Sequence, residues 1–213
     1  MSGTHERLCR PASARVPRLK LAMCRMALRL GMIMKVMLAL TALEGCLMTT
    51  FVALDFETAD HGRDSACSVG LIRVEDDRLV QRVHYLIRPP RAAFRFTHVH
   101  GIRWQDVADE PTFGERWASI QSFLQGATFL AAHNASFDKG VLYACCDLYG
   151  LARPLQPFVC TVQLARQTWN LHPTKLPNVC EYLGLQLEHH QALSDAEACA
   201  RIVLAANQPQ NVY

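Results

Sequence analysis

The chain has 213 residues, half of them hydrophobic, which is enough for one domain with a full core, with or without an extension. Its net charge of +3 is uneven: residues 1–47 hold eight Lys/Arg and two acids, whereas residues 48–213 hold 14 Lys/Arg and 17 acids. The body therefore carries a charge of −3, which excludes nucleic-acid binding through a global positive field and would require a local basic rim instead.

The N-terminal part of the chain is basic and then apolar. An arginine-rich stretch precedes an apolar run over 30–43, which Lys35 interrupts. This run is shorter than the ~20 residues of a spanning helix, so no stable membrane span is expected. A secretory signal or an amphipathic membrane-surface helix would show a similar pattern. We favour a dispensable extension over 1–47, either disordered or an upstream misread of the start site, because Met48 opens a complete domain over 48–213.

Residues 50–57 predict a buried strand that ends in two carboxylates. Apolar, β-compatible residues surround Asp55 and Glu57. Because strand side chains alternate, both acids point from the same face. Neighbouring acids on a buried strand repel each other and lose hydration, a cost that a bound divalent cation offsets. Judged from this stretch alone, the alternative is that the strand end reaches solvent and that Asp55 and Glu57 are ordinary surface acids.

A β-hairpin is expected next. Residues 67–75 and 78–88 have the composition of two strands, and Asp76-Asp77 form the turn between them. Pro89-Pro90 ends the second strand, since proline cannot donate to a strand ladder.

A long irregular connection follows over 91–111. A loop of this length inside a compact domain is often functional. Thr112 and Glu115 predict a capping box at the start of the next helix, whose apolar residues recur at helical spacing.

Strands and helices alternate over the rest of the chain. A buried strand over 127–132 leads into a helix that ends near Tyr149, before Gly150. A strand passing into a helix is expected over 158–169, and a helix over 176–183. The last helix is expected from Ser194 to about Ala206. A hairpin followed by helix–strand–helix units predicts an α/β fold, a mixed sheet with helices on both faces.

Two further acids and a histidine lie near helix starts. Asp138 follows the 127–132 strand, and a Ser194–Glu197 capping box would place Asp195 in the first turn of the last helix. His190 precedes that helix and suits a general base, as does its neighbour His189. Each feature alone also fits a simpler role, a dipole-complementing acid or a surface histidine pair. Together with Asp55 and Glu57 they predict a site for two hard metal ions acting on phosphorus.

Nine cysteines are an odd number, and no Cys-x-x-Cys pair occurs among them. This usage predicts reduced thiols and a cytoplasmic protein rather than a disulfide framework.

Three segments resemble the motifs of one nuclease family. They are Asp55-Phe-Glu57-Thr58, His133-Asn134-Ala-Ser-Phe137-Asp138 and His190-Gln-Ala-Leu-Ser-Asp195. Their order and content resemble the DEDDh 3′→5′ exonucleases, most of all the proofreading epsilon subunit of bacterial DNA polymerase III. The resemblance covers about 49–206 and implies a ribonuclease H-like fold with a five-stranded mixed sheet flanked by helices.

The resemblance also implies roles for particular residues. Asp55 would bridge two divalent ions, Mg²⁺ or Mn²⁺, Glu57 and Asp195 would complete the first site, and Asp138 would hold the second. His190 would deprotonate the attacking water. The residues implied in substrate binding are Thr58, His100, Gly101, Ile102, Asn134 and Phe137.

The implied activity is a metal-dependent exonuclease of proofreading or repair type, which removes 5′-mononucleotides from DNA 3′ ends that are single-stranded or frayed. A DNA polymerase is a candidate partner, although the chain stops at Tyr213 without the C-terminal tether of the proofreading subunit. Two alternatives stay open: an RNA-trimming exonuclease, and a non-catalytic domain that binds nucleic acid or docks on a polymerase. A few local contacts to the 2′-hydroxyl separate DNA from RNA enzymes, so the fold does not decide between them.

Overall fold

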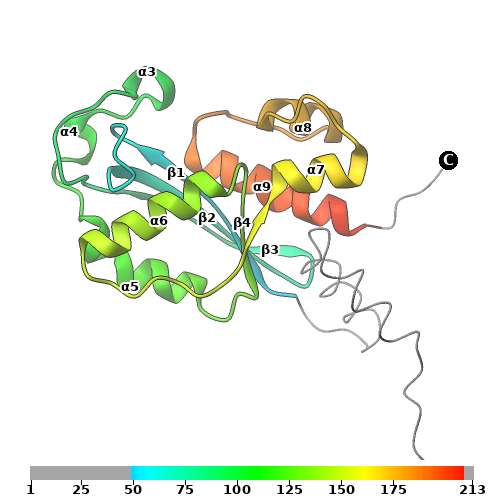
Figure 1. Cartoon of the computed structure of the whole chain (residues 1–213), viewed down its shortest axis with the longest axis horizontal. Helices are drawn as coiled ribbons and strands as arrows, with labels where there is room; N and C mark the ends of the chain where they lie inside the picture. The colour runs from blue at the N-terminus through cyan, green and yellow to red at the C-terminus, as the bar shows by residue number, and fades with distance from the viewer. Residues whose placement is uncertain (1–48, 209–213) are drawn as a thin grey trace, which may run out of the picture. The chain divides into compact units, whose positions relative to one another are not determined.

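The structure is a computed structural model that describes residues 49–208 (Figure 1). The expected N-terminal extension over 1–47 lies outside the described residues.

A five-stranded mixed sheet, in the order β3-β2-β1-β4-β5, forms the centre of the fold. β1 runs antiparallel to β2 and parallel to β4, so the strand that carries the first two acids is the middle one. The expected ribonuclease H-like fold class is confirmed. The strands are β1 (Phe51–Thr58), β2 (Ala66–Glu75), β3 (Arg78–Leu86), β4 (Phe129–Ala132) and β5 (Phe158–Cys160).

Helices lie against both faces of this sheet (Figure 1). The helices of the described chain are α3 (Thr97–His100), α4 (Trp104–Val107), α5 (Phe113–Leu124), α6 (Ser136–Leu148), α7 (Thr161–Trp169), α8 (Leu176–Leu183) and α9 (Ala192–Asn207). α9 packs across β1 and β2, and α7 and α8 pack against α9 in turn.

Alternation along β1 sorts its side chains between two environments. Leu54 and Phe56 belong to the main buried cluster, together with Phe113 and Trp117 of α5 and Leu142 of α6. Asp55 and Glu57 therefore point to the opposite face, the one that α9 covers. The same strand thus builds the core with one face and presents its acids with the other.

Local signals predicted several element ends correctly. The β2–β3 turn is formed by Asp76 and Asp77, with φ of 50° and 59°. Thr112 caps α5, accepting the Glu115 N–H at 3.3 Å while its own N–H donates to the Glu115 carboxylate at 2.7 Å. Gly184 ends α8 in the left-handed region, as its lack of a side chain allows.

Two expectations about element ends were wrong. The 91–111 connection contains the four-residue helices α3 and α4, which are too short to show a helical period. α9 begins at Ala192, so Ser194 lies inside the helix and its hydroxyl accepts the Glu188 N–H at 2.8 Å. Glu197 pairs with Arg201 instead of closing a capping box.

The six cysteines of the described chain are free thiols, and most are buried. Within residues 49–208, no helix combines the length and the apolar character needed to cross a membrane.

Candidate active site

The end of β1 is where the first three acids meet. β4 pairs with β1 only as far as Ala53, so the Phe56 N–H beyond that point has no strand partner on that side. Asp138, in the first turn of α6, accepts this N–H at 3.0 Å. Its carboxylate thereby takes the place of the missing strand and lies buried between β1 and α6, with 1 % of its surface exposed.

Asp195 reaches the same place from α9. Gly70 of β2 pairs directly with Asp55, and a Cβ on Gly70 would lie 2.1 Å from the Ala192 carbonyl oxygen. Only glycine permits this close approach of helix and strand. The first turn of α9 therefore rests on the sheet beside Asp55, and Asp195 in that turn is buried against the two acids of β1.

Three carboxylates consequently form one cluster. Oxygens of Asp55, Glu57 and Asp195 lie within 4.8 Å of one another. Burial, and then the charges of its neighbours, raises the pKa of Asp55 well above its usual value, and the same causes raise the pKa of Glu57 to about 8. Burial raises the pKa of Asp138 to about 7, against the opposing bond from Phe56. Four ionised carboxylates so close together would repel one another, so bound positive charge is needed to stabilise their charged forms.

The hydrogen bonding of one atom indicates whether these residues fit a cation. Asp195 Oδ1 is buried and has no hydrogen-bond partner among the described residues, whereas its Oδ2 accepts two hydrogen bonds. Buried acceptors without a partner are rare in folded proteins. A divalent cation among Asp55, Glu57 and Asp195 would complete the bonding of Oδ1 and offset the repulsion among the acids. Carboxylate oxygens are the ligands that hard cations prefer, so the donor set fits Mg²⁺ or Mn²⁺.

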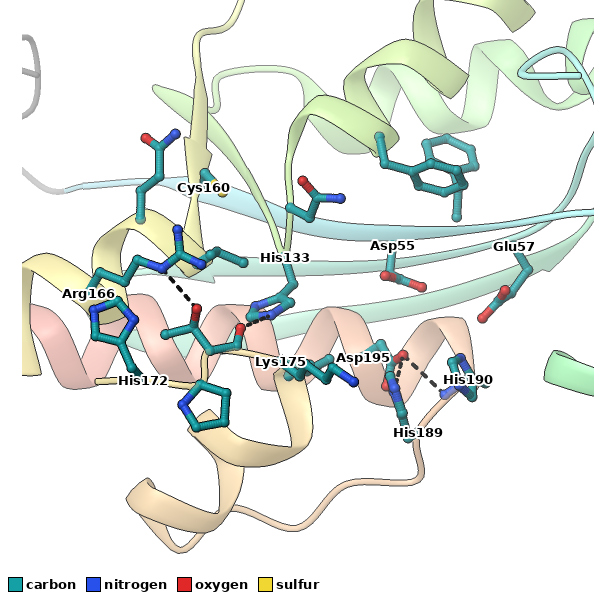
Figure 2. A pocket seen from close by; sticks show the side chains of 18 residues that line it. Asp55, Glu57, His133, Cys160, Arg166, His172, Lys175, His189, His190 and Asp195 are labelled. Atoms are coloured by element: carbon teal, nitrogen blue, oxygen red, sulfur yellow. Dashed lines mark hydrogen bonds and ion pairs between the residues drawn. The ribbon is translucent and has the colours of Figure 1, made fainter. Parts of the chain in front are cut away.

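Both histidines before α9 lie at this cluster (Figure 2). The His189 ring binds Asp195 Oδ2 through Nδ1 at 3.1 Å, and the His190 backbone N–H donates to the same oxygen at 3.1 Å. The two rings stack with centroids 3.7 Å apart. Neither ring nitrogen of His190 has a protein partner among the described residues, so the His190 imidazole is free to act on a substrate or water. Burial, and then His189, lowers the pKa of His190.

His100 is engaged within the protein. The Ile102 N–H donates to its Nδ1 at 3.1 Å, and its Nε2 lies 3.2 Å from the Thr58 carbonyl. These partners assign the proton to Nε2, and burial lowers the pKa of the ring. His100 thus ties the loop after α3 to the end of β1. Thr58, His100, Gly101 and Ile102 adjoin the cluster but do not line the cleft described next.

A cleft of about 750 Å³ opens over the carboxylates. Asn134 and Phe137, also expected to bind substrate, line it together with Asp55, Glu57, Asp195 and His190, whereas Asp138 lies behind it. Phe137 is 38 % exposed, so an aromatic face is available in the cleft. Asn134 has a φ of 60°, which turns the chain between β4 and α6.

Sequence reasoning missed two structural supports of this site. Gly70 could have been noticed as a lone glycine inside an apolar strand, which often marks a close backbone approach. His133 opens the second motif, but nothing in the sequence indicated its structural role: its Nδ1 lies 2.9 Å from the Thr161 hydroxyl and its Nε2 2.9 Å from the Thr174 carbonyl. It fixes the segment before α8 beside the end of β4, and that segment forms one wall of the cleft.

The fold and the carboxylate cluster together define a ribonuclease H-like nuclease domain. The chain belongs to the exonuclease family RNase_T, whose family model matches residues 52–203. The resemblance to the DEDDh exonucleases is thereby confirmed.

Relatives and solved structures agree with this assignment. PolC-type DNA polymerase III of Thermotoga petrophila is 32 % identical over 160 residues, which cover 73 % of this chain and 12 % of the relative. The corresponding protein of Clostridium perfringens is 31 % identical over 159 residues, covering 72 % and 11 %. The chain therefore spans only a small part of these relatives' length.

Two solved structures show the fold. Exonuclease X in complex with 5′ overhanging duplex DNA superimposes with a TM-score of 0.60 at 24 % identity, covering 73 % of this chain and 90 % of that one. The nuclease domain of 3′hExo, a DEDDh family member bound to rAMP, gives a TM-score of 0.65 at 17 % identity, covering 75 % and 92 %.

Proposed function

We propose that this domain is a metal-dependent 3′→5′ exonuclease that hydrolyses phosphodiester bonds at DNA 3′ ends and releases 5′-mononucleotides. The observation that carries the proposal is the carboxylate cluster of Asp55, Glu57 and Asp195, with oxygens within 4.8 Å of one another and one buried oxygen that has no hydrogen-bond partner among residues 49–208. Membership of the exonuclease family supports the reaction class.

The acids supply the charge pattern of a site for two divalent ions. Asp55 lies centrally and would contribute to both, Glu57 and Asp195 to the first, and Asp138 to the second. Divalent ions bound there would supply positive charge that activates the attacking water and neutralises charge developing on phosphate oxygens. Burial, and then the charges of Asp195 and Asp138, raises the pKa of Glu57 to about 8. Bound positive charge would offset both effects and keep this carboxylate ionised.

His190 is the proposed general base. Its ring nitrogens are free of protein partners among the described residues, and its lowered pKa keeps the ring neutral at pH 7, the form that accepts a proton. His189 is the weaker candidate because its Nδ1 is bound to Asp195. The positive φ of His190, 68°, results from the sharp turn that brings its backbone N–H to the same carboxylate.

The cleft offers contacts for the terminal nucleotide. The exposed face of Phe137 suits base stacking, which tolerates any base, and Asn134 provides a polar group beside it. Contact of Thr58 and the His100–Ile102 loop with the terminal nucleotide is also part of the proposal; His100 ties this loop to the end of β1 through the Thr58 carbonyl.

DNA is the favoured polymer because the relatives at 31–32 % identity are DNA polymerases of PolC type. Those relatives also support a proofreading role beside a polymerase. RNA is the second candidate, since one solved neighbour is bound to rAMP and another is a 3′-exonuclease that recognises a histone mRNA stem-loop.

A time course on 5′-labelled single-stranded DNA, beside RNA of the same sequence, tests the proposal. With Mn²⁺ or Mg²⁺ we expect a ladder that shortens from the 3′ end and disappears in EDTA or in Asp55→Asn. Asp109→Asn is the matched control, because Asp109 is an exposed acid away from the cleft. The ratio of DNA to RNA rates names the substrate. If neither polymer shortens with metal present, the enzymatic proposal fails in favour of a binding domain.

A further inference from the structure

The cleft continues past the carboxylates to a wall made by α7 and the segment that precedes α8. Figure 2 shows Asp55, Glu57 and Asp195 at one end and Arg166 with His172 at the other. Lys175 is drawn between the two groups. Among the lining residues, the only acids are those three carboxylates, and the only Lys/Arg residues are Arg166 and Lys175.

Neither of these cations is neutralised by the part of the chain that is described. Lys175 has no hydrogen bond or ion pair there, and Arg166 uses only Nε, which donates to the Thr174 hydroxyl at 3.0 Å. By contrast, Arg91 is paired with carboxylates at 2.8–3.0 Å. The bond to Thr174 orients the Arg166 side chain and leaves its two terminal nitrogens available, which is the geometry that favours phosphate oxygens.

The local placement matters because the body carries net negative charge, with 14 Lys/Arg and 17 acids over residues 48–213. A polyanionic strand is therefore not attracted by the domain as a whole, and phosphates away from the metal site need cations of their own. Along the cleft, Lys175 lies between the carboxylates and Arg166, and Arg166 lies at the end away from the carboxylates. A strand that follows the cleft would therefore bring phosphates beside cations that no described carboxylate neutralises.

We propose that Arg166 and Lys175 form a subsite along the cleft for non-scissile phosphates of the substrate strand. The inference rests on the proposed function, in which the scissile phosphodiester lies at the carboxylates. The subsite binds the backbone and reads no base, so it holds strands of more than one phosphate without sequence preference. It makes the enzyme prefer a polymer over a single terminal nucleotide ester.

Two substrates distinguish phosphate binding at this subsite from hydrolysis at the carboxylates. Thymidine 5′-monophosphate p-nitrophenyl ester contains one phosphodiester, whereas a single-stranded oligothymidylate contains many. Arg166→Met and Lys175→Met should each raise KM for the oligonucleotide about tenfold, with kcat nearly unchanged. Both variants should hydrolyse the ester at the wild-type rate. Each should also reduce the slope of log affinity for the oligonucleotide against log salt by about 0.7.

Control variants distinguish the effect of losing a positive charge in the cleft from the effect of a structural change. Thr174→Val removes the acceptor that orients Arg166 but keeps both charges, so it should raise KM for the oligonucleotide less than Arg166→Met does and leave hydrolysis of the ester unchanged; an equal loss on both substrates would assign this contact a structural role. Arg78→Met removes an exposed charge on β3, outside the cleft, and should leave KM unchanged. An unchanged KM in both Arg166→Met and Lys175→Met, or an equal loss on ester and oligonucleotide, overturns the inference.

A binding experiment tests the proposed subsite even if the protein hydrolyses no substrate. If the wild-type protein hydrolyses neither substrate, the proposed function fails, and the subsite is then judged by fluorescence anisotropy of a labelled oligothymidylate. Adding Arg166→Met to Asp55→Asn should weaken that binding about tenfold, and unchanged binding refutes the subsite.

Discussion

Gly70 offers the sharpest test of how the site is held together. A Cβ on this residue would lie 2.1 Å from the Ala192 carbonyl oxygen and 2.5 Å from the Leu193 nitrogen, whereas ordinary contact begins at 3.4 Å. Gly70→Ala therefore requires the start of α9 to move by about 1.3 Å, the difference between 3.4 and 2.1 Å. The atoms in the way belong to the backbone, so no side-chain rotation relieves the clash.

The displaced turn is the one that carries Asp195 and follows His190. Overpacking of this kind costs about 1–3 kcal/mol of unfolding free energy. A shift near 1 Å in a positioning element costs about 100-fold in rate. We therefore expect Gly70→Ala to lower stability by about 2 kcal/mol in urea denaturation and to lower kcat on a 5′-labelled oligonucleotide about 100-fold.

Gly140→Ala is the matched control, because the three atoms nearest to its new Cβ all belong to the Arg63 side chain, whose guanidinium end can move aside. Alanine is also the better residue inside a helix, so this variant should keep activity and lose no stability. If Gly70→Ala retained activity within twofold and folded normally, the close approach of α9 to β2 would not be what positions Asp195.

Three further predictions concern the acids and histidines. His190→Gln should lower kcat at least 100-fold and His189→Gln much less; the reverse order in steady-state assays would exchange their roles. Mg²⁺ or Mn²⁺ at 100 times its Kd should stabilise the wild type by about 2.7 kcal/mol in calorimetry, but Asp195→Asn by much less; equal shifts would place the metal elsewhere. Arg91 holds the pKa of Asp60 at about 2, so the ion pair stabilises the fold above the ordinary carboxyl pKa of about 3.9 and is lost as the pH falls toward 2. Arg91→Met should therefore cost up to about 1 kcal/mol at pH 6 in urea denaturation and much less at pH 2, where about half of Asp60 is protonated; a cost independent of pH would contradict this pairing.

Local chemistry determined the elements that could be predicted from the sequence. The apolar run with alternating acids predicted β1 and placed Asp55 and Glu57 on one face, because strand geometry alone sets that alternation. The turn at Asp76-Asp77 and the Thr112 cap depend on residues within three positions of each other, so they too were visible. The order of the three motifs then indicated the family.

Tertiary contacts decided what the sequence left open or mispredicted. Ser194 could have capped a helix, but its hydroxyl accepts the Glu188 N–H, and Glu197 contacts Arg82 of β3 as well as Arg201. Capping boxes are local patterns, and the fold offered both side chains other partners.

The functional arrangement itself belongs to the tertiary structure. The sequence determined which carboxylates and histidines are present and which strand and helix starts carry them. Only the folded chain brings Asp138 to the Phe56 N–H and the His189 ring to Asp195. Within the described part of the chain, it also leaves Asp195 Oδ1 and the His190 ring without a hydrogen-bond partner. The physical reason is that burying charge is costly, and whether that cost is met depends on groups supplied by segments distant in the sequence.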